Sequence, residues 1–531
     1  MKRSQWIRAY PPVKGLNKSV NPLLLTLNDL SNADDIFYST DLERAQRPGQ
    51  GAFTVSSEIN SQSSPQVTFL NDFWYRSGSA QTQRVVKYSA NFVEADTGGD
   101  GVFANITGPT ALTINDRVTG DNLANRLILG FENAVPQTST GGALSDLGGS
   151  PPNGSIIRKH INRLFISGID ATPHDIFFSN AFQPTVWSGR GTGSLSVDPD
   201  DSDPVGVTAL FPSFRGEEYV GKRNSLYQIT GNNPFNYQII PITSGIGAIE
   251  HNAVCQIQND MLFVSDRGIH SLVATLQGKV ADTDLLSFPV RKLWEDEINL
   301  NQSKRFWLRY IRSLNSILFL YPAGNSTYCT HALGLNLYTG GWFRWPNVNI
   351  SSIAEIVDSN RRIVLVGRND GIVAELDDRF YSDIGGEIKP FISIGPTYVG
   401  GSPDIDVGLK NINPSYSTRS GASMTVNYKI DDLSTKSLTF GSSTTGTNLG
   451  SFVTGSDVLG SDPSSISKIK PMEGTGKALT LQFKKASSGL TLGSSALGQT
   501  AMSSANNSLN VQGFSLEVER ISENESTVAV G

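Results

Sequence analysis

The densest group of possible metal ligands in the sequence is an acidic cluster at 198–203, which reads Asp-Pro-Asp-Asp-Ser-Asp. Its carboxylates are the hard oxygen ligands that Ca²⁺ prefers. Calcium takes about six to eight oxygens, however, and the segment lacks both the glycine and the distant glutamate of an EF-hand loop. The pattern favours a solvated acidic turn before a strand at 205–207, with a cation bound between Asp198 and Asp203 as the alternative.

Histidine and cysteine, the usual zinc ligands, are few and widely spaced. No His-x-x-x-His or Cys-x-x-Cys spacing occurs, and two cysteines cannot scaffold a secreted disulfide fold. We predict that Cys255 and Cys329 are buried free thiols, because an unpaired cysteine behaves as a small core hydrophobe. The five histidines are His160, His174, His251, His270 and His331.

Motifs for phosphate binding and nucleophilic catalysis are weak. The segment at 189–193, Gly-Arg-Gly-Thr-Gly, resembles a phosphate loop, but no predicted helix follows it whose N-terminus could receive an anion. We interpret it as a flexible connector. The sequence also lacks a Gly-x-Ser-x-Gly elbow and a P-loop lysine.

Carbohydrate chemistry is the remaining enzymatic possibility, because a pair of catalytic carboxylates can come from distant parts of the chain. The segment at 265–268, Ser-Asp-Arg-Gly, approaches the sialidase turn Ser-x-Asp-x-Gly-x-Thr-Trp, but its aspartate is one place early and no aromatic residue follows. Trp342 and Trp345, with Tyr338 and Phe343, could stack on a sugar, although aromatic residues at the end of a blade more often pack between blades. We predict no enzymatic activity and assign no catalytic, cofactor-binding or metal-binding residue.

A recurring unit between about 155 and 380 organises the middle of the chain. It consists of an asparagine, one or two polar residues and a short apolar run. Asparagine bonds to nearby backbone and tolerates positive φ, so it suits a reversal between two strands. The run after it is predicted to be a strand buried on both faces, and Asp-Gly at 370–371 predicts a hairpin. The five units begin at Asn162, Asn224, Asn259, Asn315 and Asn360.

The spacing of these units is centred near the ~40–50 residues of a four-stranded propeller blade. Further strand-rich stretches lie at 67–69, 84–88 and 125–129. We therefore predict a β-propeller of about six to eight blades, with loop insertions, over residues 20–385. A pair of antiparallel sandwiches is the alternative.

The C-terminal region has a different pattern. Three of its segments place apolar residues at every second position, which is typical of a sheet with one wet face. We predict a β-sandwich or jelly-roll-like domain over 386–521, an N-terminal arm at 1–19 and a flexible tail at 522–531. The whole chain is thus predicted to be all-β. The alternating segments are 424–430, 478–483 and 514–520.

Charge and hydropathy exclude two classes of protein. The 531 residues carry 43 Lys and Arg against 49 Asp and Glu, a net charge of -6, whereas dedicated nucleic-acid binders usually have a basic surface. No run approaches the ~20 apolar residues of a membrane helix, and the N-terminus has no stretch typical of a signal peptide. We expect synthesis in the cytoplasm without membrane insertion.

Several phrases, in their order along the chain, resemble the tail nozzle proteins of short-tailed bacteriophages. The opening contributes Gly-Leu-Asn at 15–17, Asn-Pro-Leu-Leu-Leu at 21–25 and an Arg-Pro-Gly turn at 47–49. The resemblance covers roughly 14–380, but 33–36 lacks an expected asparagine, and the loops at 95–125 and 133–155 have no clear counterpart. The middle phrases are 162–165, 178–179, 187–188, 222–231, 244–247, 263–269 and 338–342.

The resemblance implies a structural component of the virion tail. Six copies would form a ring below the portal and adaptor, continue the DNA channel, plug it before infection and open during ejection. The implied partners are the adaptor, a tail fibre or spike, and passing genomic DNA that is not bound specifically. The choice between a nozzle and another hub or stopper ring stays open, as do the blade count and ring order.

Physical arguments agree with a conduit. Each phosphate neutralised by a fixed Lys or Arg adds salt-dependent affinity that would retard DNA, and the acidic net charge avoids this. Identical subunits can close a ring through head-to-tail contacts. Polar segments at 431–465 and 486–512 are candidates for such contacts or for fibre docking, with solvated loops as the alternative. A propeller-based receptor-binding or carbohydrate-active tail protein is the second functional hypothesis.

Overall fold

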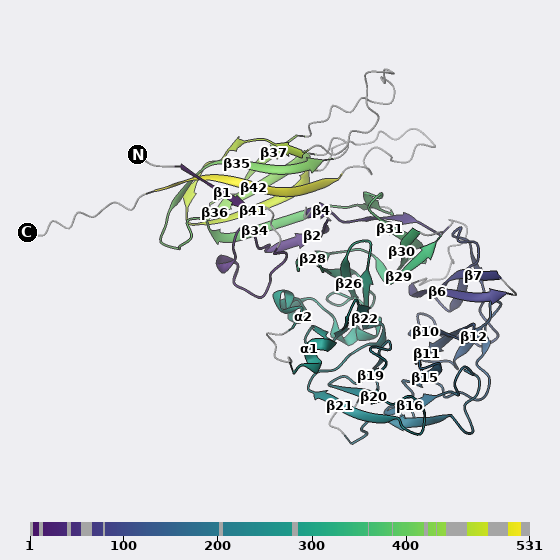
Figure 1. The fold of residues 1–531 in the computed structure, drawn as a ribbon. Coiled ribbons are helices and arrows are strands. Elements are labelled where there is room, and N and C mark those ends of the chain that lie inside the picture. Colours follow the sequence, from purple (N-terminus) through teal and green to yellow (C-terminus); the bar gives the residue numbers. More distant parts are fainter. Residues whose placement is uncertain are drawn as a thin grey trace, which may run out of the picture. The chain divides into compact units, whose positions relative to one another are not determined.

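The computed structural model contains two compact units, each built from separate segments of the chain. The first unit comprises Met1–Gln50, Leu333–Pro346 and Asp377–Gly531, and the second comprises Gly51–Ala332 and Asn347–Leu376. Strands dominate both units (Figure 1). The structure describes residues 4–9, 14–39, 44–54, 66–77, 80–200, 205–278, 285–358, 361–384, 386–418, 423–431, 433–441, 465–486 and 508–521.

The second unit begins with four antiparallel meanders of four strands each. The strands of each sheet are ordered in space as they are in sequence. The sheets are β6 (Val67–Ser77), β7 (Ala80–Ser89), β8 (Phe92–Asp96) and β9 (Phe103–Asn105); β10 (Val118–Leu123), β11 (Arg126–Phe131), β12 (Gln137–Ser139) and β13 (Ser145–Asp146); β14 (Ile156–His160), β15 (Arg163–Ser167), β16 (Asp175–Phe178) and β17 (Gly193–Ser196); β18 (Ala209–Leu210), β19 (Glu218–Gly221), β20 (Ser225–Thr230) and β21 (Gln238–Ser244).

Three more sheets follow in this unit, with short helical segments between them. Among the described residues no helix is long and apolar enough to cross a bilayer. The strands are β22 (Val254–Ile257), β23 (Asp260–Val264) and β24 (Ile269–Ser271); β25 (Trp307–Ile311) and β26 (Ser316–Tyr321); β29 (Ile350–Asp358), β30 (Arg361–Arg368) and β31 (Val373–Asp377). The helical segments are η3 (His251–Ala253), α1 (Leu272–Leu276), η5 (Phe288–Val290), α2 (Lys292–Asp296) and η6 (Leu300–Arg305).

The first strands of these seven sheets contact one another in a closed cycle. β6 contacts β10, β10 contacts β14, and β14 contacts β18; β18 contacts η3, which leads into β22. β22 then contacts β25, β25 contacts β29, and β29 contacts β6. Figure 1 shows the sheets of this unit placed around one centre. Meanders arranged in this way form a β-propeller, and the seven sheets fall within the predicted range of blades.

The ring closes between the two ends of the second unit. The backbone amides of Phe53 and Thr54 donate hydrogen bonds to the Val373 carbonyl at 3.0 and 2.9 Å, and the Val373 amide donates to the Thr54 hydroxyl at 2.9 Å. Phe53 also packs against a buried cluster shared by the first and seventh sheets. The last sheet therefore takes its outer segment from the start of the unit.

The asparagine-led repeat predicted from the sequence is confirmed. Each of its five apolar runs forms the second strand of its sheet, namely β15, β20, β23, β26 and β30. Asn162 and Asn315 adopt φ values of 57° and 44°, which is the left-handed turn conformation expected before a strand. Every residue of β15 and β26 is buried, as predicted for strands between two neighbours. Asn360 lies outside the described residues.

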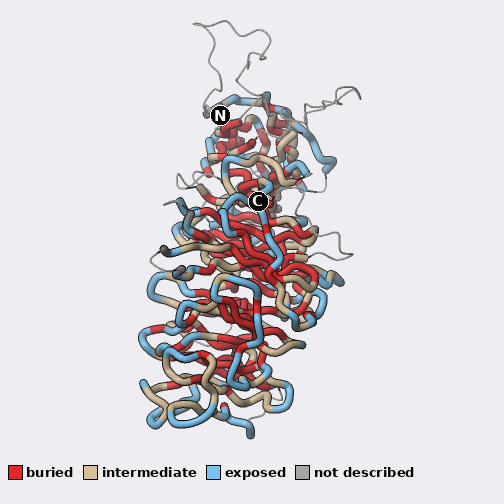
Figure 2. The backbone as a smooth tube through the Cα atoms, turned by 90° about the vertical axis from the view of Figure 1, so that its right-hand side faces the viewer, coloured by how far each residue is buried: buried red, intermediate tan, exposed pale blue. Residues whose placement is uncertain are grey.

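Hydrophobic packing joins successive sheets face to face. Phe165 of the third sheet shares a cluster with Tyr227 of the fourth. Phe211 of the fourth sheet lies 5.7 Å from Phe263 of the fifth, measured between ring centroids. Figure 2 shows buried backbone along the strands and exposed backbone in the loops. Each meander buries its faces on its neighbours, which is how a propeller obtains its core.

The first unit contains two larger sheets and a small ribbon. One sheet contains β1 (Ser4–Ala9), β3 (Ile36–Tyr38), β4 (Arg44–Gln46), β35 (Val407–Thr418), β38 (Ser465–Ser467), β39 (Lys470–Pro471), β40 (Thr475–Gly476) and β42 (Leu509–Arg520). The other has the spatial order β28 (Trp342–Trp345), β2 (Asn32–Asp34), β34 (Phe391–Tyr398), β41 (Ala478–Ala486), β36 (Ser423–Ile430), β37 (Lys436–Phe440). The ribbon pairs β32 (Ser382–Asp383) with β33 (Gly386–Glu387), η1 covers Pro22–Leu24, and the unit boundary crosses β5 (Gly49–Ala52) and β27 (His331–Asn336).

These two sheets pack as a β-sandwich, as predicted for the C-terminal region. Every second residue of β36 is buried, which confirms the period-two pattern. Phe483 of β41 lies 5.5 Å from Phe514 of β42, and Tyr416 of β35 lies 6.2 Å from Phe440 of β37, between ring centroids. Both ring pairs join one sheet to the other. Aromatic contacts of this kind between inner faces form the core of a sandwich.

The two units do not follow the predicted boundaries of 1–19, 20–385 and 386–521. Residues 20–50 belong to the first unit because their strands pair there, with Asn32 of β2 opposite Ser393 of β34. The segment predicted as an arm contains β1, which pairs with β42 and places Ile7 opposite Leu516. The predicted tail at 522–531 lies outside the described residues.

The Arg-Pro-Gly turn at 47–49 forms a buried ionic clamp in the first unit. Arg47 is 3% exposed; its Nε donates to the Asp35 carboxylate at 2.7 Å and its Nη1 donates to Asp383 at 2.9 Å. Burial alone lowers the pKa of Arg47, but hydrogen bonding and charge from Asp383 and Asp35 raise it above its usual value. At Gly49 a side chain is excluded, because a Cβ atom would lie 2.4 Å from the Ser382 carbonyl oxygen.

Candidate functional site

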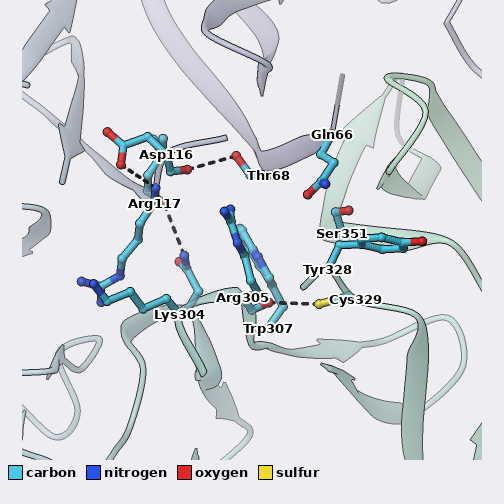
Figure 3. A pocket seen from close by; sticks show the side chains of 12 residues that line it. Gln66, Thr68, Asp116, Arg117, Lys304, Arg305, Trp307, Tyr328, Cys329 and Ser351 are labelled. Carbon is cyan, nitrogen blue, oxygen red and sulfur yellow. Dashed lines mark hydrogen bonds between the residues drawn. The ribbon is translucent and has the colours of Figure 1, made fainter. Parts of the chain in front are cut away.

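The first strands of the propeller begin at one end of its axis, where residues in or just before the first strand of each of the seven sheets line two adjoining pockets. The narrow pocket is lined from β6, β10, β25, β29 and η3, and the lining of a cavity of about 250 Å³ includes residues just before β14 and β18. Arg117 and Lys304 line both pockets. We call this region the axial mouth; Figure 3 shows its narrow part. Its defining residues are Gln66, Thr68, Arg117, Lys304, Arg305 and Ser351.

Two of the cations at the axial mouth are matched by carboxylates. Arg117 Nη2 and Nε donate to Glu250 Oε1 at 3.0 and 3.1 Å, across the ring from the second sheet to the fifth. Lys304 pairs with Glu132 on the more exposed side. Burial raises the pKa of Glu250, and the charge and hydrogen bonds of Arg117 oppose that shift.

Arg305 differs from these cations. Within the described part of the chain, no hydrogen bond or ion pair of its guanidinium is found, whereas its carbonyl oxygen accepts from the Cys329 thiol at 3.1 Å. Figure 3 shows the Arg305 side chain directed toward Thr68. The local backbone is held by a buried thiol while the charged end faces the pocket.

The interior of the axis is filled by polar side chains. Glu250 and His251 are 1% and 2% exposed. Arg158 Nη2 lies 3.0 Å from His251 Nε2, and Arg309 Nη1 donates to the Asn252 carbonyl at 3.2 Å. Burial, together with the neighbouring guanidinium groups, holds the pKa of His251 well below its usual range, and burial lowers the pKa of Arg309 to about 10. The axis is therefore packed and carries several positive charges.

Asp198, the first residue of the acidic cluster at 198–203, lies beside a cation. Lys222 is fully buried and its Nζ donates to the Asp198 carbonyl at 2.7 Å, while the Tyr227 hydroxyl lies 3.3 Å from Asp198 Oδ2. Residues 201–203 lie outside the described part, and no group of three or more metal-ligating residues is found in the rest. An ammonium group at this turn opposes a bound cation.

The strand predicted at 205–207 is wrong by a few residues. β18 covers Ala209–Leu210, because the Val207 amide is engaged instead by the Pro173 carbonyl at 2.8 Å. The glycine-rich segment at 189–193 leads into the strand β17, as its interpretation as a connector without a following helix requires. The predicted hairpin at 370–371 is confirmed, since it joins β30 to β31.

The histidines do not gather at one place. His160 Nδ1 lies 3.3 Å from Glu218 Oε2 between the third and fourth sheets, where both side chains are fully buried. Burial lowers the pKa of His160 to about 4 and raises that of Glu218 well above its usual value. His270 stacks on Phe263 with ring centroids 5.3 Å apart. These positions place histidine in the packing between blades and in one buried acid pair.

The sialidase-like segment at 265–268 is a tight turn between β23 and β24. The Ser265 hydroxyl accepts from the Arg267 and Gly268 amides at 3.0 and 3.2 Å. The same hydroxyl lies 2.8 Å from His270 Nε2. Its polar atoms are therefore used to close the hairpin.

The aromatic cluster near 342 packs inside the first unit. Trp342, Phe343 and Trp345 are 1% exposed or less, whereas Tyr338 is 74% exposed. Trp345 Nε1 donates to the Ile36 carbonyl at 2.7 Å. Three of the four rings are packing residues, but they pack inside the first unit and not between blades; the sugar-stacking platform is wrong. The prediction of two buried free thiols is also confirmed.

The residues of the axial mouth were missed from the sequence. Arg117 and Glu250 are 133 residues apart, so no local spacing connects them. The available signal was position, because Arg117 and Arg305 both stand shortly before the first strand of a blade. First strands can be recognised only after the blades have been counted.

No known protein family matches this sequence, and neither does any curated protein. Solved structures with similar folds include YCF48 from Cyanidioschyzon merolae, at 10% identity over 62% of this chain and 98% of that chain, with a TM-score of 0.36. The WD40 β-propeller domain of Doa1 is 9% identical over 62% and 97%, with a TM-score of 0.38. An exo-β-1,3-galactanase from Phanerochaete chrysosporium is 10% identical over 89% and 100%, with a TM-score of 0.27. The propeller fold rests on the closed ring of sheets.

Proposed function

We propose that this chain is a virion structural protein of a phage tail, a nozzle-like subunit that forms a ring around the DNA channel and gates genome ejection. The observation that carries the proposal is a closed propeller whose own axis is filled by buried side chains. The phrases that resemble tail nozzle proteins occur in the same order over roughly 14–380, and this resemblance supports a nozzle as the assembly.

A filled axis has a direct consequence for a conduit. Glu250 and His251 are buried on the axis, and Arg117 reaches across it. Double-stranded DNA has no passage through such a packed centre. A channel made by this chain therefore needs several copies around a shared axis. The copies are joined by heterologous contacts, which form a closed ring when the rotation between neighbouring copies adds up to a full turn.

The charge of the chain supports the same proposal. A lumen rich in Lys and Arg would hold phosphates with salt-dependent affinity, and the net charge of -6 opposes this. The resemblance supports a hexamer in the virion tail, with the adaptor above and a fibre or spike as a further partner. The candidate contact segments at 431–465 and 486–512 lie largely outside the described residues.

Two measurements test the ring. The purified protein is examined by mass photometry and by negative-stain microscopy, and intact particles are labelled with an antibody against this chain. We expect closed rings, six copies by resemblance, and label at the tail. Monomers at every concentration, together with unlabelled particles, would contradict the proposal.

A receptor-binding or carbohydrate-active role is the second candidate, and it has lost its main support. Of the four aromatic residues that motivated it, only Tyr338 is exposed. Incubation with host surface glycans is therefore expected to give neither cleavage nor saturable binding. Saturable binding that Tyr338→Ala abolishes would favour this alternative.

A further inference from the structure

We propose that the axial mouth binds the carboxylate of an acidic peptide segment, with Arg305 as the anchoring cation. Arg305 is half-buried where η6 ends and β25 begins, and its guanidinium has no hydrogen-bond or ion-pair partner among the described residues. Figure 3 shows Arg305 and Gln66 directed from opposite sides into the same space. This proposal does not rest on ring assembly.

The nearest carboxylate in the pocket is already engaged elsewhere. Asp116 accepts from the Asn133 amide nitrogen and Nδ2 at 3.2 and 3.0 Å, and from the Arg117 amide at 2.9 Å. Figure 3 shows the Asp116 carboxylate turned away from Arg305. Because the carboxylates of Glu250 and Glu132 pair with Arg117 and Lys304, Arg305 keeps an unmatched positive charge.

Neutral polar side chains line the pocket around this charge. The Thr68 hydroxyl donates to the Asp116 carbonyl over a long 3.3 Å and the Ser351 hydroxyl donates to Asn369 Oδ1, while the Gln66 amide lines the same pocket. A guanidinium presents a planar fork of N–H donors that matches the two oxygens of a carboxylate. The chemistry of the pocket therefore fits a planar anion better than a cation or an apolar group.

The size of the pocket selects the kind of anion. Its narrow part has about 10 Å³ of free space, which is room for about one water-sized group. A carboxylate on a slim side chain can place an oxygen there, whereas a phosphodiester is flanked by two bulky sugars. The adjoining cavity of about 250 Å³, which Arg117 and Lys304 also line, can take a neighbouring residue of the same segment.

Calorimetric titration of the full-length protein with a hexaglutamate peptide tests the site. Arg305→Gln should weaken binding by about ten- to a hundredfold, the equivalent of a charge-assisted hydrogen bond of about 1.5–3 kcal/mol. The matched control is Arg291→Gln, since Arg291 is exposed and lies outside both pockets, and its affinity should stay that of the wild type. Thr68→Val, which keeps the shape of the side chain, should weaken binding by about three- to tenfold. Thermal unfolding of each variant checks that it folds. If Arg305→Gln does not fold, the affinity of Thr68→Val decides the test.

Three results would overturn the proposal. They are no binding of hexaglutamate to the wild type at low salt, an equal loss in Arg291→Gln, and tighter Arg305-dependent binding of single-stranded DNA than of the peptide. The first two would remove the site, and the third would replace its occupant by a phosphate backbone. Mass photometry measures ring assembly independently of peptide binding. A titration without binding therefore leaves the assembly proposal in place.

Discussion

Two buried guanidinium groups, one in each unit, have opposite surroundings. Arg47 lies between the carboxylates of Asp35 and Asp383, which raise its pKa in spite of burial. Arg309 donates only to two backbone carbonyls in the described structure and lies 4.6 Å from the ring centroid of Trp307. Burial lowers its pKa to about 10.

The difference in surroundings gives the two arginines different roles. Arg47 stabilises the structure through matched charges, whereas the charge of Arg309 has no carboxylate partner in the described structure. In the first unit the ionic clamp joins segments more than 300 residues apart and leaves its charges matched. On the propeller axis Arg309 lies near Arg158, and each charge disfavours the other. Removing a cation should therefore be costly where it leaves carboxylates behind and mild where it does not.

The largest expected effect is at the clamp. Arg47→Ala should lower the free energy of unfolding by about 3–5 kcal/mol, because two half-buried carboxylates lose their buried cation. Urea unfolding followed by circular dichroism measures the loss. The control is Arg379→Ala, which breaks the exposed pair with Asp377 and should cost about 1 kcal/mol or less. Equal losses of unfolding free energy in the two variants would show that the buried clamp stabilises the protein no more than an exposed ion pair does.

A buried carboxyl without a guanidinium sharpens the comparison. Both oxygens of Glu218 lack a hydrogen-bond partner in the described structure, and burial raises its pKa. Its contribution to stability is therefore complete below about pH 4.3, the unfolded value, and is lost as pH rises through the folded pKa. Glu218→Gln should therefore gain stability relative to the wild type as pH rises. The difference in free energy of unfolding, variant minus wild type, should be about 1–3 kcal/mol larger at pH 8 than at pH 5, at ~1.4 kcal/mol per pH unit.

Thermal unfolding at the two pH values measures this shift. His160 has the opposite pH dependence, because its lowered pKa costs stability as pH falls from about 6.5 to about 4. Arg158 and Asp121, which also act on Glu218, are present in both proteins. Glu295→Gln on the surface should show no pH-dependent difference. The same slope in Glu218→Gln and the wild type would show that Glu218 is ionised when buried.

The sequence predicted the propeller because the relevant signal is local. An asparagine before an apolar run, as at Asn162 and Asn315, specifies a reversal and the strand after it within a few residues. The period-two pattern of β36 and β41 likewise predicted a sheet with one buried face. Both signals depend only on neighbouring residues.

The unit boundaries and the axial mouth were not predictable in this way. Ala33 pairs with Ile392 and Arg117 pairs with Glu250, and nothing in either segment specifies so distant a partner. The buried clamp of Arg47 was visible only as an Arg-Pro-Gly phrase, without the carboxylates that explain it. Pairing between distant segments is a property of the folded chain.

A milder change tests the other side of the comparison. Arg309→Met removes a buried charge that has no carboxylate partner in the described structure, so it should cost about 1 kcal/mol or less. The remaining cost comes from the Asn252 carbonyl, which loses a donor. The same urea experiment measures it. A loss as large as that of Arg47→Ala would mean that Arg309 is held by a counter-charge after all.

The smallest expected effect concerns a third buried cation, Lys222. Its Nζ donates to the backbone carbonyl of Asp198, so the first residue of the acidic segment already has a positive charge beside it. Adding Ca²⁺ or a chelator should leave the melting temperature unchanged, because only a ligand that binds the native state shifts apparent stability. Magnesium at the same ionic strength is the control for screening. Stabilisation by calcium that the chelator reverses would mean that the turn binds the ion despite Lys222.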